Sequence, residues 1–130
     1  MKTILTLLVV SFLMGCSENN MFEIGQKTTM KVNPVYDAGD VMLGEEIEAV
    51  FEVKNTGEYP LVIAEVKGSC SCTVVDRPEK PIAPGKSEKI RATVKTESAI
   101  EGNLVKEVRI TANTEPSTTV LKINAKVISK

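Results

Sequence analysis

Two cysteines that stand one residue apart have the clearest capacity for chemistry in this 130-residue sequence. Cys70 and Cys72 lie in the stretch KGSCSCTVVD, and the chain contains no histidine. Cysteines at this spacing can form a disulfide, bind a soft metal ion, act as a nucleophile, or pack as two small apolar side chains. Each role needs different surroundings, which the rest of the sequence restricts.

A disulfide between Cys70 and Cys72 is close to the geometric limit for an extended chain. Residues two apart in a strand share a face, but their Cα atoms lie roughly 6.5–7 Å apart, at the upper end of the range that a disulfide bridges. A bent loop would shorten this distance, although closing so small a ring contributes only about 1.5 kcal/mol. An oxidised pair and a pair of reduced, buried cysteines both remain open.

Metal binding is the next alternative for Cys70 and Cys72. Structural zinc takes four Cys or His ligands, which this part of the chain does not offer. Two thiolates can bind Cu(I), with Met30 or Met42 as additional soft ligands, although methionines also fill cores. We therefore expect no metal and no cofactor, and a disulfide or loop-shaping role for the two cysteines. A copper site at Cys70 and Cys72 is kept as the alternative.

Patterns typical of catalysis are missing. A nucleophilic cysteine needs an activating base, and only Lys67, Arg77 and carboxylates stand nearby. Without histidine, the chain lacks the side chain used most often as a general base near neutral pH. The run from Gly85 to Ser87 ends like a phosphate-binding loop but lacks its earlier glycine. The sequence predicts a protein with no catalytic residues, not an enzyme.

The composition argues against a nucleic-acid partner. The formal net charge is −1, so there is no large basic field to attract phosphates. Aromatic residues make up 4% of the chain and tryptophan is missing, which leaves few surfaces on which bases could stack. Acidic residues at 45, 46 and 48 are expected on the solvent face of a strand.

The first sixteen residues have the layout of a secretory signal. Lys2 supplies a positive charge, and a nearly continuous apolar run follows from Ile4 to Met14. This run is about half of the roughly 20 residues that a membrane-spanning helix needs. Its end, Leu-Met-Gly-Cys, resembles the lipobox of bacterial lipoproteins. In those proteins the cysteine is lipidated, the signal is cut just before it, and the cysteine becomes the first residue of the mature protein. The resemblance implies that Cys16 carries acyl chains, which anchor the protein in a membrane.

We therefore expect three segments: a signal peptide at residues 1–15, a lipidated polar tether at residues 16–27, and one domain at residues 28–130. Apolar and polar residues alternate with a period of two around residues 47–53, 90–94, 108–112 and 121–127. A more buried strand is expected at residues 61–66, and one or two more within residues 30–43. Turns are expected at residues 55–60, where Gly57 would supply a positive φ, at 81–86, and at Gly102 and Asn103.

About seven short strands with regular turns predict an all-β, immunoglobulin-like antiparallel sandwich. The motifs Asn-Thr-Gly at residues 55–57, Cys-Ser-Cys-Thr at 70–73 and Pro-Gly at 84–85 occur in one order. Together they resemble a bacterial lipoprotein family of unknown function, found mostly in Bacteroidetes, with the signature Asn-Thr-Gly … Cys-Gly-Cys-Thr … Pro-Gly. That family is related to the immunoglobulin-like domains of major sperm protein, Hydin and abnormal-spindle protein. Ser71 stands where the family usually has glycine.

We expect a non-enzymatic, lipid-anchored protein of the cell envelope that binds another protein or an envelope component. The membrane anchor would be the acyl chains on Cys16, and the expected location is the outer membrane, facing the periplasm or the surface. A sandwich offers free sheet edges, which can accept a partner strand, and loops at its ends. The alternative is a periplasmic copper- or thiol-handling protein that uses Cys70 and Cys72.

Overall fold

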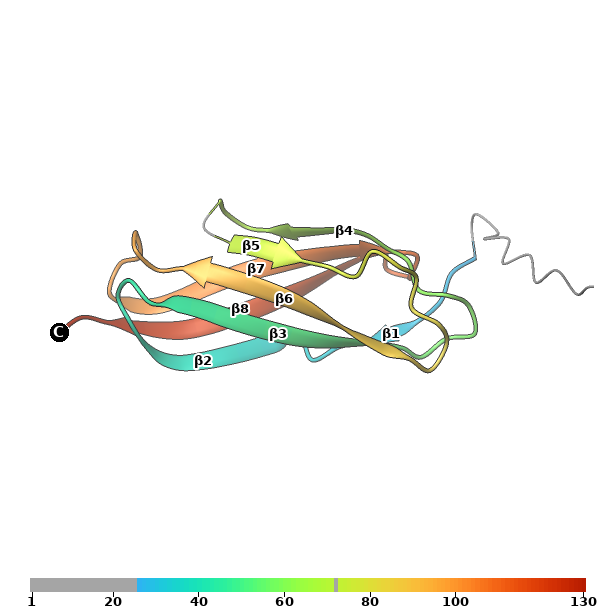
Figure 1. Ribbon diagram of the computed structural model, residues 1–130, viewed down its shortest axis with the longest axis horizontal. Coiled ribbons are helices and arrows are strands. Elements are labelled where there is room, and N and C mark those ends of the chain that lie inside the picture. Colours follow the sequence, from blue (N-terminus) through green and yellow to red (C-terminus); the bar gives the residue numbers. More distant parts are fainter. Residues whose placement is uncertain (1–25, 72) are drawn as a thin grey trace, which may run out of the picture.

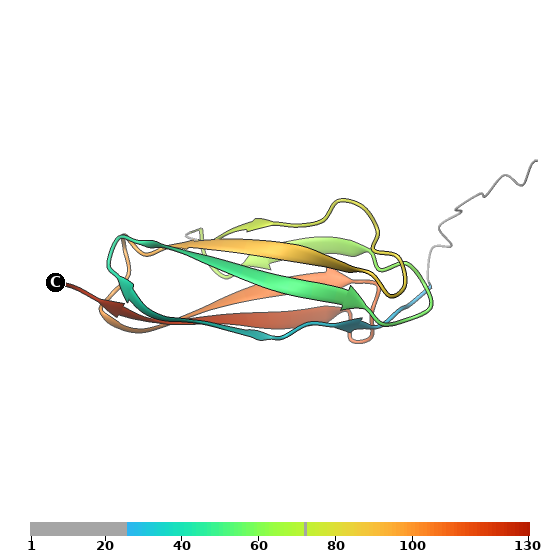
Figure 2. The same cartoon turned by 60° about the horizontal axis from the view of Figure 1, so that its bottom comes forward.

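The computed structural model describes residues 26–71 and 73–130, and every regular element within them is a β-strand. Two four-stranded sheets, with strand orders β1-β3-β6-β5 and β2-β8-β7-β4, pack face to face in an elongated sandwich (Figure 1; Figure 2). In chain order the strands are β1 (Met30–Lys31), β2 (Val35–Met42), β3 (Glu46–Asn55), β4 (Ile63–Gly68), β5 (Thr73–Asp76), β6 (Ser87–Lys95), β7 (Gly102–Ala112) and β8 (Thr118–Ile128). The expected all-β, immunoglobulin-like sandwich is confirmed.

The strands differ from the prediction in number and at one turn. Eight strands replace the expected seven, because the short strand β5 follows directly after the cysteines. The predicted turn at Gly102 and Asn103 is wrong, since both residues already belong to β7 and pair with β8. The turn lies earlier, at residues 96–101, where the amide of Ala99 donates to the carbonyl of Thr96 at 2.9 Å.

One strand pair is parallel in a sandwich that was expected to be antiparallel. Strand β1 pairs with β3 in the first sheet, and after residues 32–34 the chain enters the second sheet as β2. There β2 runs parallel to β8, with Tyr36 opposite Ile123. The amide of Lys122 donates to the carbonyl of Pro34 at 2.7 Å, at the point where β2 joins its neighbour. The parallel pair thus follows from a chain that changes sheets without reversing direction.

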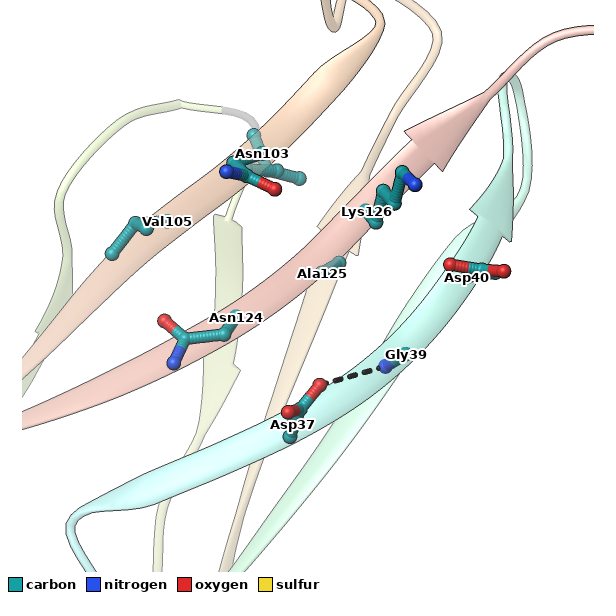
Figure 3. A pocket seen from close by; sticks show the side chains of 9 residues that line it. Asp37, Gly39, Asp40, Asn103, Val105, Asn124, Ala125 and Lys126 are labelled. Atoms are coloured by element: carbon teal, nitrogen blue, oxygen red, sulfur yellow. Dashed lines mark hydrogen bonds between the residues drawn. The ribbon is translucent and has the colours of Figure 1, made fainter.

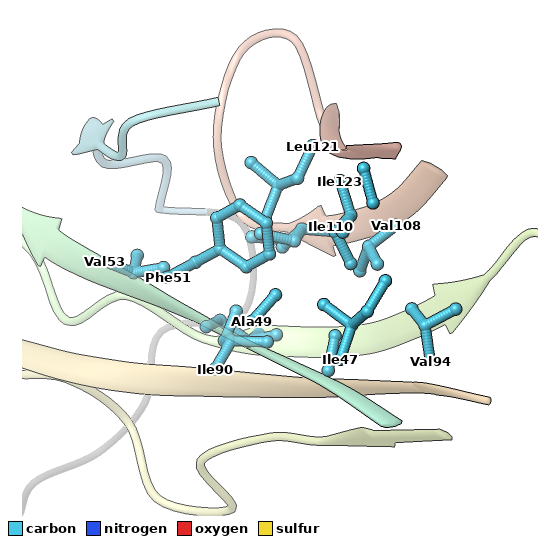
Figure 4. Packing of buried hydrophobic residues seen from close by; sticks show 14 of the residues in the cluster. Ile47, Ala49, Phe51, Val53, Ile90, Val94, Val108, Ile110, Leu121 and Ile123 are labelled. Carbon is cyan, nitrogen blue, oxygen red and sulfur yellow. The ribbon is translucent and has the colours of Figure 1, made fainter. Parts of the chain in front are cut away.

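The core lies between the two sheets and follows the predicted alternation. Along β3, buried and exposed residues alternate without interruption, and Phe51 is only 3% exposed while Glu52 faces solvent. The ring of Phe51 meets that of Tyr36 edge to face, with centroids 6.2 Å apart. Aliphatic side chains from both sheets fill the remaining space (Figure 4). The core members on the central strands include Ile47, Ala49, Val53, Ile90, Val94, Val108, Ile110, Leu121 and Ile123.

The sandwich has two distinct ends. The proximal end, where the described chain begins, holds residues 26–29 and the turns at 55–60, 83–86 and 113–117 (Figure 1). The distal end holds the turns at residues 43–45 and 96–101. The loop that contains Cys70 lies between β4 and β5, on the distal side of the molecule (Figure 1).

Several sequence predictions concern residues outside the described part of the chain. These are the signal peptide at residues 1–15, the lipidated Cys16, most of the tether, and Cys72. No helix among the described residues is long and apolar enough to cross a membrane. Gln26 and Lys27, the two described residues of the segment expected as tether, both contact the domain.

Candidate functional site

The loop between β4 and β5 positions Cys70, the described member of the cysteine pair. Cys70 is half-buried and takes part in a disulfide bond. Its sulfur lies 3.7 Å from Oγ1 of Thr73, and the amide of Thr73 donates to the carbonyl of Cys70 at 3.1 Å. Because a disulfide sulfur carries no proton, the hydroxyl of Thr73 is the donor in the first contact. Both contacts hold the loop in a tight turn.

The same loop is fastened to the neighbouring strand β7. The amide of Ser69 donates to the carbonyl of Glu107 at 2.9 Å, and the amide of Glu107 donates to Oγ of Ser69 at 3.2 Å. Gly68 lies so close to Thr73 that an added Cβ would come within 2.7 Å of the threonine Cβ. A side chain at position 68 would therefore push the two strands apart. The loop is built on a close backbone approach.

A shallow hollow of about 450 Å³ lies beside this loop. Its walls are the half-buried Val66 and Val75 of the two edge strands, together with the loop residues around Cys70. Cys70 is half-buried and lines this hollow, and thiol–disulfide exchange would require solvent access at this position. Among the described residues, the polar side chains that line the hollow beside Cys70 are Lys67, Ser69, Ser71 and Thr73, with no carboxylate among them.

The structure does not bring the two methionines of the copper hypothesis to Cys70. Met30 lies in β1 at the proximal end, opposite Asn55, and packs against the core. Met42 is the last residue of β2. Strands β2 and β4 form the two edges of their sheet, with β8 and β7 between them. Among the described residues, no three His, Cys, Asp or Glu side chains are grouped closely enough to hold a metal ion. A copper ion bound at Cys70 would need further ligands other than Met30 and Met42.

The Asn-Thr-Gly motif builds the proximal end. Asn55 is fully buried and uses both polar atoms of its side chain. Its Nδ2 donates to the carbonyls of Tyr59 at 2.7 Å and Ile82 at 2.9 Å. Its Oδ1 accepts from Oγ1 of Thr28 at 2.8 Å and from the amide of Gly57 at 3.1 Å. One side chain thus joins the first described segment, its own turn and the turn before β6.

Gly57 is required beside Asn55 for a reason that the sequence did not predict. Positive φ occurs at Gly39, Gly44, Gly85 and Gly102, and not at Gly57, so the predicted reason for this glycine is wrong. An added Cβ would instead lie 2.1 Å from Oγ1 of Thr28 and 2.7 Å from the amide nitrogen of Thr29. The glycine is needed because the first described segment crosses directly over it.

Asn113 forms a second joint at the proximal end. Its Nδ2 donates to the carbonyls of Gln26 at 3.1 Å and Pro60 at 2.9 Å, and its Oδ1 accepts from the amide of Val62 at 2.7 Å. The amide of Thr28 donates to the Asn113 carbonyl at 2.9 Å. These contacts fix where the chain enters the domain.

An exposed ion pair adds to this entry point. Lys27 and Glu115 form a salt bridge, and the Lys27 ammonium, through its hydrogen bond and its charge, holds the pKa of the Glu115 carboxyl below its ordinary value. Both side chains are open to solvent, so the pair contributes little to stability. It marks the path of the chain at the proximal end.

A second hollow, of about 390 Å³, lies on the outer face of the sheet β2-β8-β7-β4. A bulge in β2 between Asp37 and Asp40 opens it, and Oδ1 of Asp37 accepts from the amide of Gly39 at 2.9 Å (Figure 3). Asn103, Asn124 and Lys126 add polar groups from β7 and β8. The Asp37 contact shapes the bulge, which interrupts the edge of β2.

The comparison with protein families decides the classification. The family model described as protein of unknown function DUF1573 matches residues 23–127. The chain belongs to this family. The match confirms that the family is one of unknown function, while its expected lipoprotein nature, Bacteroidetes origin and sequence signature stay predictions. No curated protein is similar enough in sequence to count as a match.

Solved structures support the fold. A protein of unknown function from Porphyromonas gingivalis W83 is similar with a TM-score of 0.68 and 22% identity over 78% of this chain. The chain covers 48% of that protein, about half of its length. The ASH/PapD-like domain 7 of human CEP192 is similar with a TM-score of 0.58 and 15% identity, covering 80% of this chain and 88% of that one. The expected relation to abnormal-spindle-type domains is thus shown at the level of the fold.

A protease also appears among the similar structures. The secreted serine protease VesC from Vibrio cholerae matches with a TM-score of 0.61 and 10% identity, over 79% of this chain and 24% of the protease. Identity this low shows a shared fold alone, and a fold does not carry its host's activity. Proteolysis is not inferred for this DUF1573 chain.

Proposed function

We propose that this DUF1573 chain is a non-enzymatic, lipid-anchored protein of the cell envelope whose immunoglobulin-like domain binds another protein or an envelope component. The observation that carries the proposal is the difference between the two ends of the sandwich. The described chain enters at the proximal end, where Asn55 and Asn113 fix its path. An anchor at Cys16 would hold this end towards the membrane and direct the distal end outwards.

The distal end offers apolar side chains to a partner. Ile100 is 86% exposed and Leu43 is 42% exposed, each on one of the two distal turns. Thr96, which is fully buried, accepts from the amide of Gly44 at 2.9 Å and donates to the carbonyl of Glu45 at 2.5 Å. This threonine ties the two turns together, so the aliphatic side chains are presented on a fixed frame. Fixed presentation lowers the entropy cost of binding.

The sheet edges are less suited to a partner strand than the sequence suggested. The register of β4 shifts between Ile63 and Glu65, and Nη1 of Arg77 donates to the carbonyl of Ile63 at 2.9 Å. Strand β2 carries the bulge at Asp37, and β1 and β5 have two and four residues. Bulges, short strands and covered carbonyls are the devices that keep edges from pairing. The distal turns are therefore the proposed contact.

A second candidate function is thiol–disulfide exchange through Cys70. The disulfide bond of Cys70 and the hollow beside it favour this candidate. The copper alternative needs a thiolate, which a cysteine in a disulfide does not provide until it is reduced. Of the two forms of the alternative function, handling of thiols therefore has more support than handling of copper.

Cross-linking in native membranes tests the binding proposal. The full chain carrying Leu43→Glu and Ile100→Glu should lose the cross-linked partner that the unchanged protein retains, because two charges replace the apolar contact. Val120→Glu is the matched control, since Val120 is 38% exposed on the outer face of β8. Retention of the same partner by the distal variant, or its loss in the control alone, would contradict a distal contact.

A further inference from the structure

The outer face of the sheet β1-β3-β6-β5 carries two parallel rows of opposite charge. We define its acidic row as Glu46, Glu48 and Glu52 on β3, and its basic row as Lys89, Arg91 and Lys95 on β6. The rows are in register, because Glu46 lies opposite Lys95 and Glu52 lies opposite Lys89. All six side chains are exposed. Val50, 42% exposed, lies in the middle of the acidic row, opposite Arg91.

None of these six side chains forms an ion pair within 4.0 Å with another described residue. Among the described residues, the one ion pair within 4.0 Å joins Lys27 and Glu115, far from this face. Adjacent strands lie roughly 4.8 Å apart, so a carboxylate and an ammonium on neighbouring strands attract each other but can also turn outwards. The rows are therefore available to a charged partner in front of the sheet.

We propose that a second copy of this chain docks on this face. The acidic row of one copy is complementary in charge to the basic row of another under two-fold symmetry. A two-fold axis that runs along the strands, midway between β3 and β6, places the β3 of each copy over the β6 of the other. Each acidic row then lies over a basic row. Glu46 of one copy faces Lys95 of the other, and each Val50 faces the aliphatic part of Arg91.

The charge pattern also selects the relative direction of the two copies. An axis across the strands would place β3 over β3 and acidic row over acidic row, which repels. The favoured axis along the strands leaves the proximal ends of both copies at the same end of the dimer. Two chains arranged in this way can enter from one membrane surface. The docking itself does not depend on the proposed lipid anchor.

The size of the face indicates a weak dimer. Ten residues of β3 span about 33 Å. Four strands span roughly 15–20 Å across, which gives a face of several hundred Å², below the roughly 800 Å² per partner of a typical stable interface. Confinement of both copies to one membrane would raise their effective concentration. Added salt should weaken the dimer, because the screening length falls from about 10 Å at 0.1 M to about 3 Å at 1 M.

Zero-length cross-linking of the full chain tests the docking directly. Equal amounts of ¹⁴N- and ¹⁵N-labelled protein are mixed at low salt, in a non-ionic detergent with micelles in large excess, and treated with a carbodiimide. We expect mixed-isotope peptides that join Glu46 to Lys95 and Glu52 to Lys89. The proposal would be overturned if linked peptides of these residues carried one isotope only, because such links join residues within one chain. It would also be overturned if mixed-isotope links were confined to other surfaces.

Two charge-reversed variants supply an independent test by sedimentation. The first carries Glu46→Lys, Glu48→Lys and Glu52→Lys, and the second carries Lys89→Glu, Arg91→Glu and Lys95→Glu. Each should weaken self-association at least about tenfold, whereas an equal mixture should associate again, since a fully basic face then meets a fully acidic one. The control Lys122→Glu with Lys126→Glu, on the other sheet, should dimerise like the unchanged protein. Undiminished self-association of either reversed variant, or no association in their mixture, would refute the docking.

Discussion

Asn55 uses its whole side-chain hydrogen-bonding capacity inside the protein. Two donated and two accepted hydrogen bonds connect three chain segments that are distant in sequence. None of the described buried side-chain nitrogen or oxygen atoms lacks a partner. Asn55 therefore serves the fold, because a buried amide whose hydrogen bonds are all satisfied within the protein has nothing left to offer a ligand.

Replacement of Asn55 should be costly. Asn55→Ala should lower the free energy of unfolding by about 2–3 kcal/mol, because it removes four hydrogen bonds, to the carbonyls of Tyr59 and Ile82, the amide of Gly57 and the hydroxyl of Thr28. Denaturant unfolding measures this loss. Asn103→Ala, at an exposed asparagine of β7, is the control and should change stability by under about 0.5 kcal/mol. Equal losses of unfolding free energy from both substitutions would show that the hydrogen bonds of Asn55 contribute no more to stability than an exposed asparagine does.

The cysteine pair should contribute to stability and not to chemistry. In a chain shortened to begin at residue 17, so that Cys70 and Cys72 are the remaining cysteines, replacement of both by serine should cost no more than about 1–3 kcal/mol. Membrane targeting and partner binding of the full chain should survive the same change. Intact mass reports whether the pair is oxidised, and metal analysis should find no stoichiometric copper or zinc.

Two results would reverse this ranking of the cysteine roles. Stoichiometric metal that disappears in the double variant would favour copper binding. Turnover of a disulfide substrate by the unchanged protein alone would favour thiol–disulfide exchange.

At the scale of the element, strand β3 fixes which face of the first sheet is buried. Phe51→Ala should lower the free energy of unfolding by about 3–5 kcal/mol, because Phe51 packs among core residues and against Tyr36. Glu52→Ala, one residue further and exposed, should cost under about 0.5 kcal/mol. Equal costs in denaturant unfolding would mean that the register is shifted by one residue.

Long alternating strands were predictable from the sequence, and short edge strands were not. β3, β6, β7 and β8 bury one face each, so a period of two marks them over many residues. β5 has four residues and β1 has two, too few for a period to emerge. The change of sheet after β1 also carries no local signal, since it depends on which neighbouring strand is free to pair.

The candidate site was predictable in position and only partly in role. The cysteine spacing located the loop between β4 and β5, and Asn55 and Gly57 were expected in a turn. Their actual task, contact with Thr28, joins residues 27 positions apart in sequence, which local patterns do not encode. Asn113 and Thr96 were missed for the same reason, because each holds segments separated by about 50 residues.

The domain as a whole has a proximal end, which the proposed anchor would hold at the membrane, and a distal end that carries exposed aliphatic side chains. The proximal joints at Asn55 and Asn113, the distal aliphatic residues Leu43 and Ile100, and the charged face along β3 and β6 all have a defined direction relative to the point of entry. That direction has functional meaning if the chain is held at Cys16. Anchoring at this residue is therefore the claim on which the proposed function rests.

Fractionation of cells that make the full chain, with either Cys16 or Cys16→Ala, tests this claim most directly. The unchanged protein should be found in the membrane fraction, with an intact mass that lacks residues 1–15 and includes acyl chains. Cys16→Ala should leave the membrane fraction or accumulate as uncleaved precursor, because the acceptor of the lipid is gone. A Cys16→Ala protein that is cleaved and membrane-bound like the unchanged one would contradict the lipid anchor and the orientation built on it.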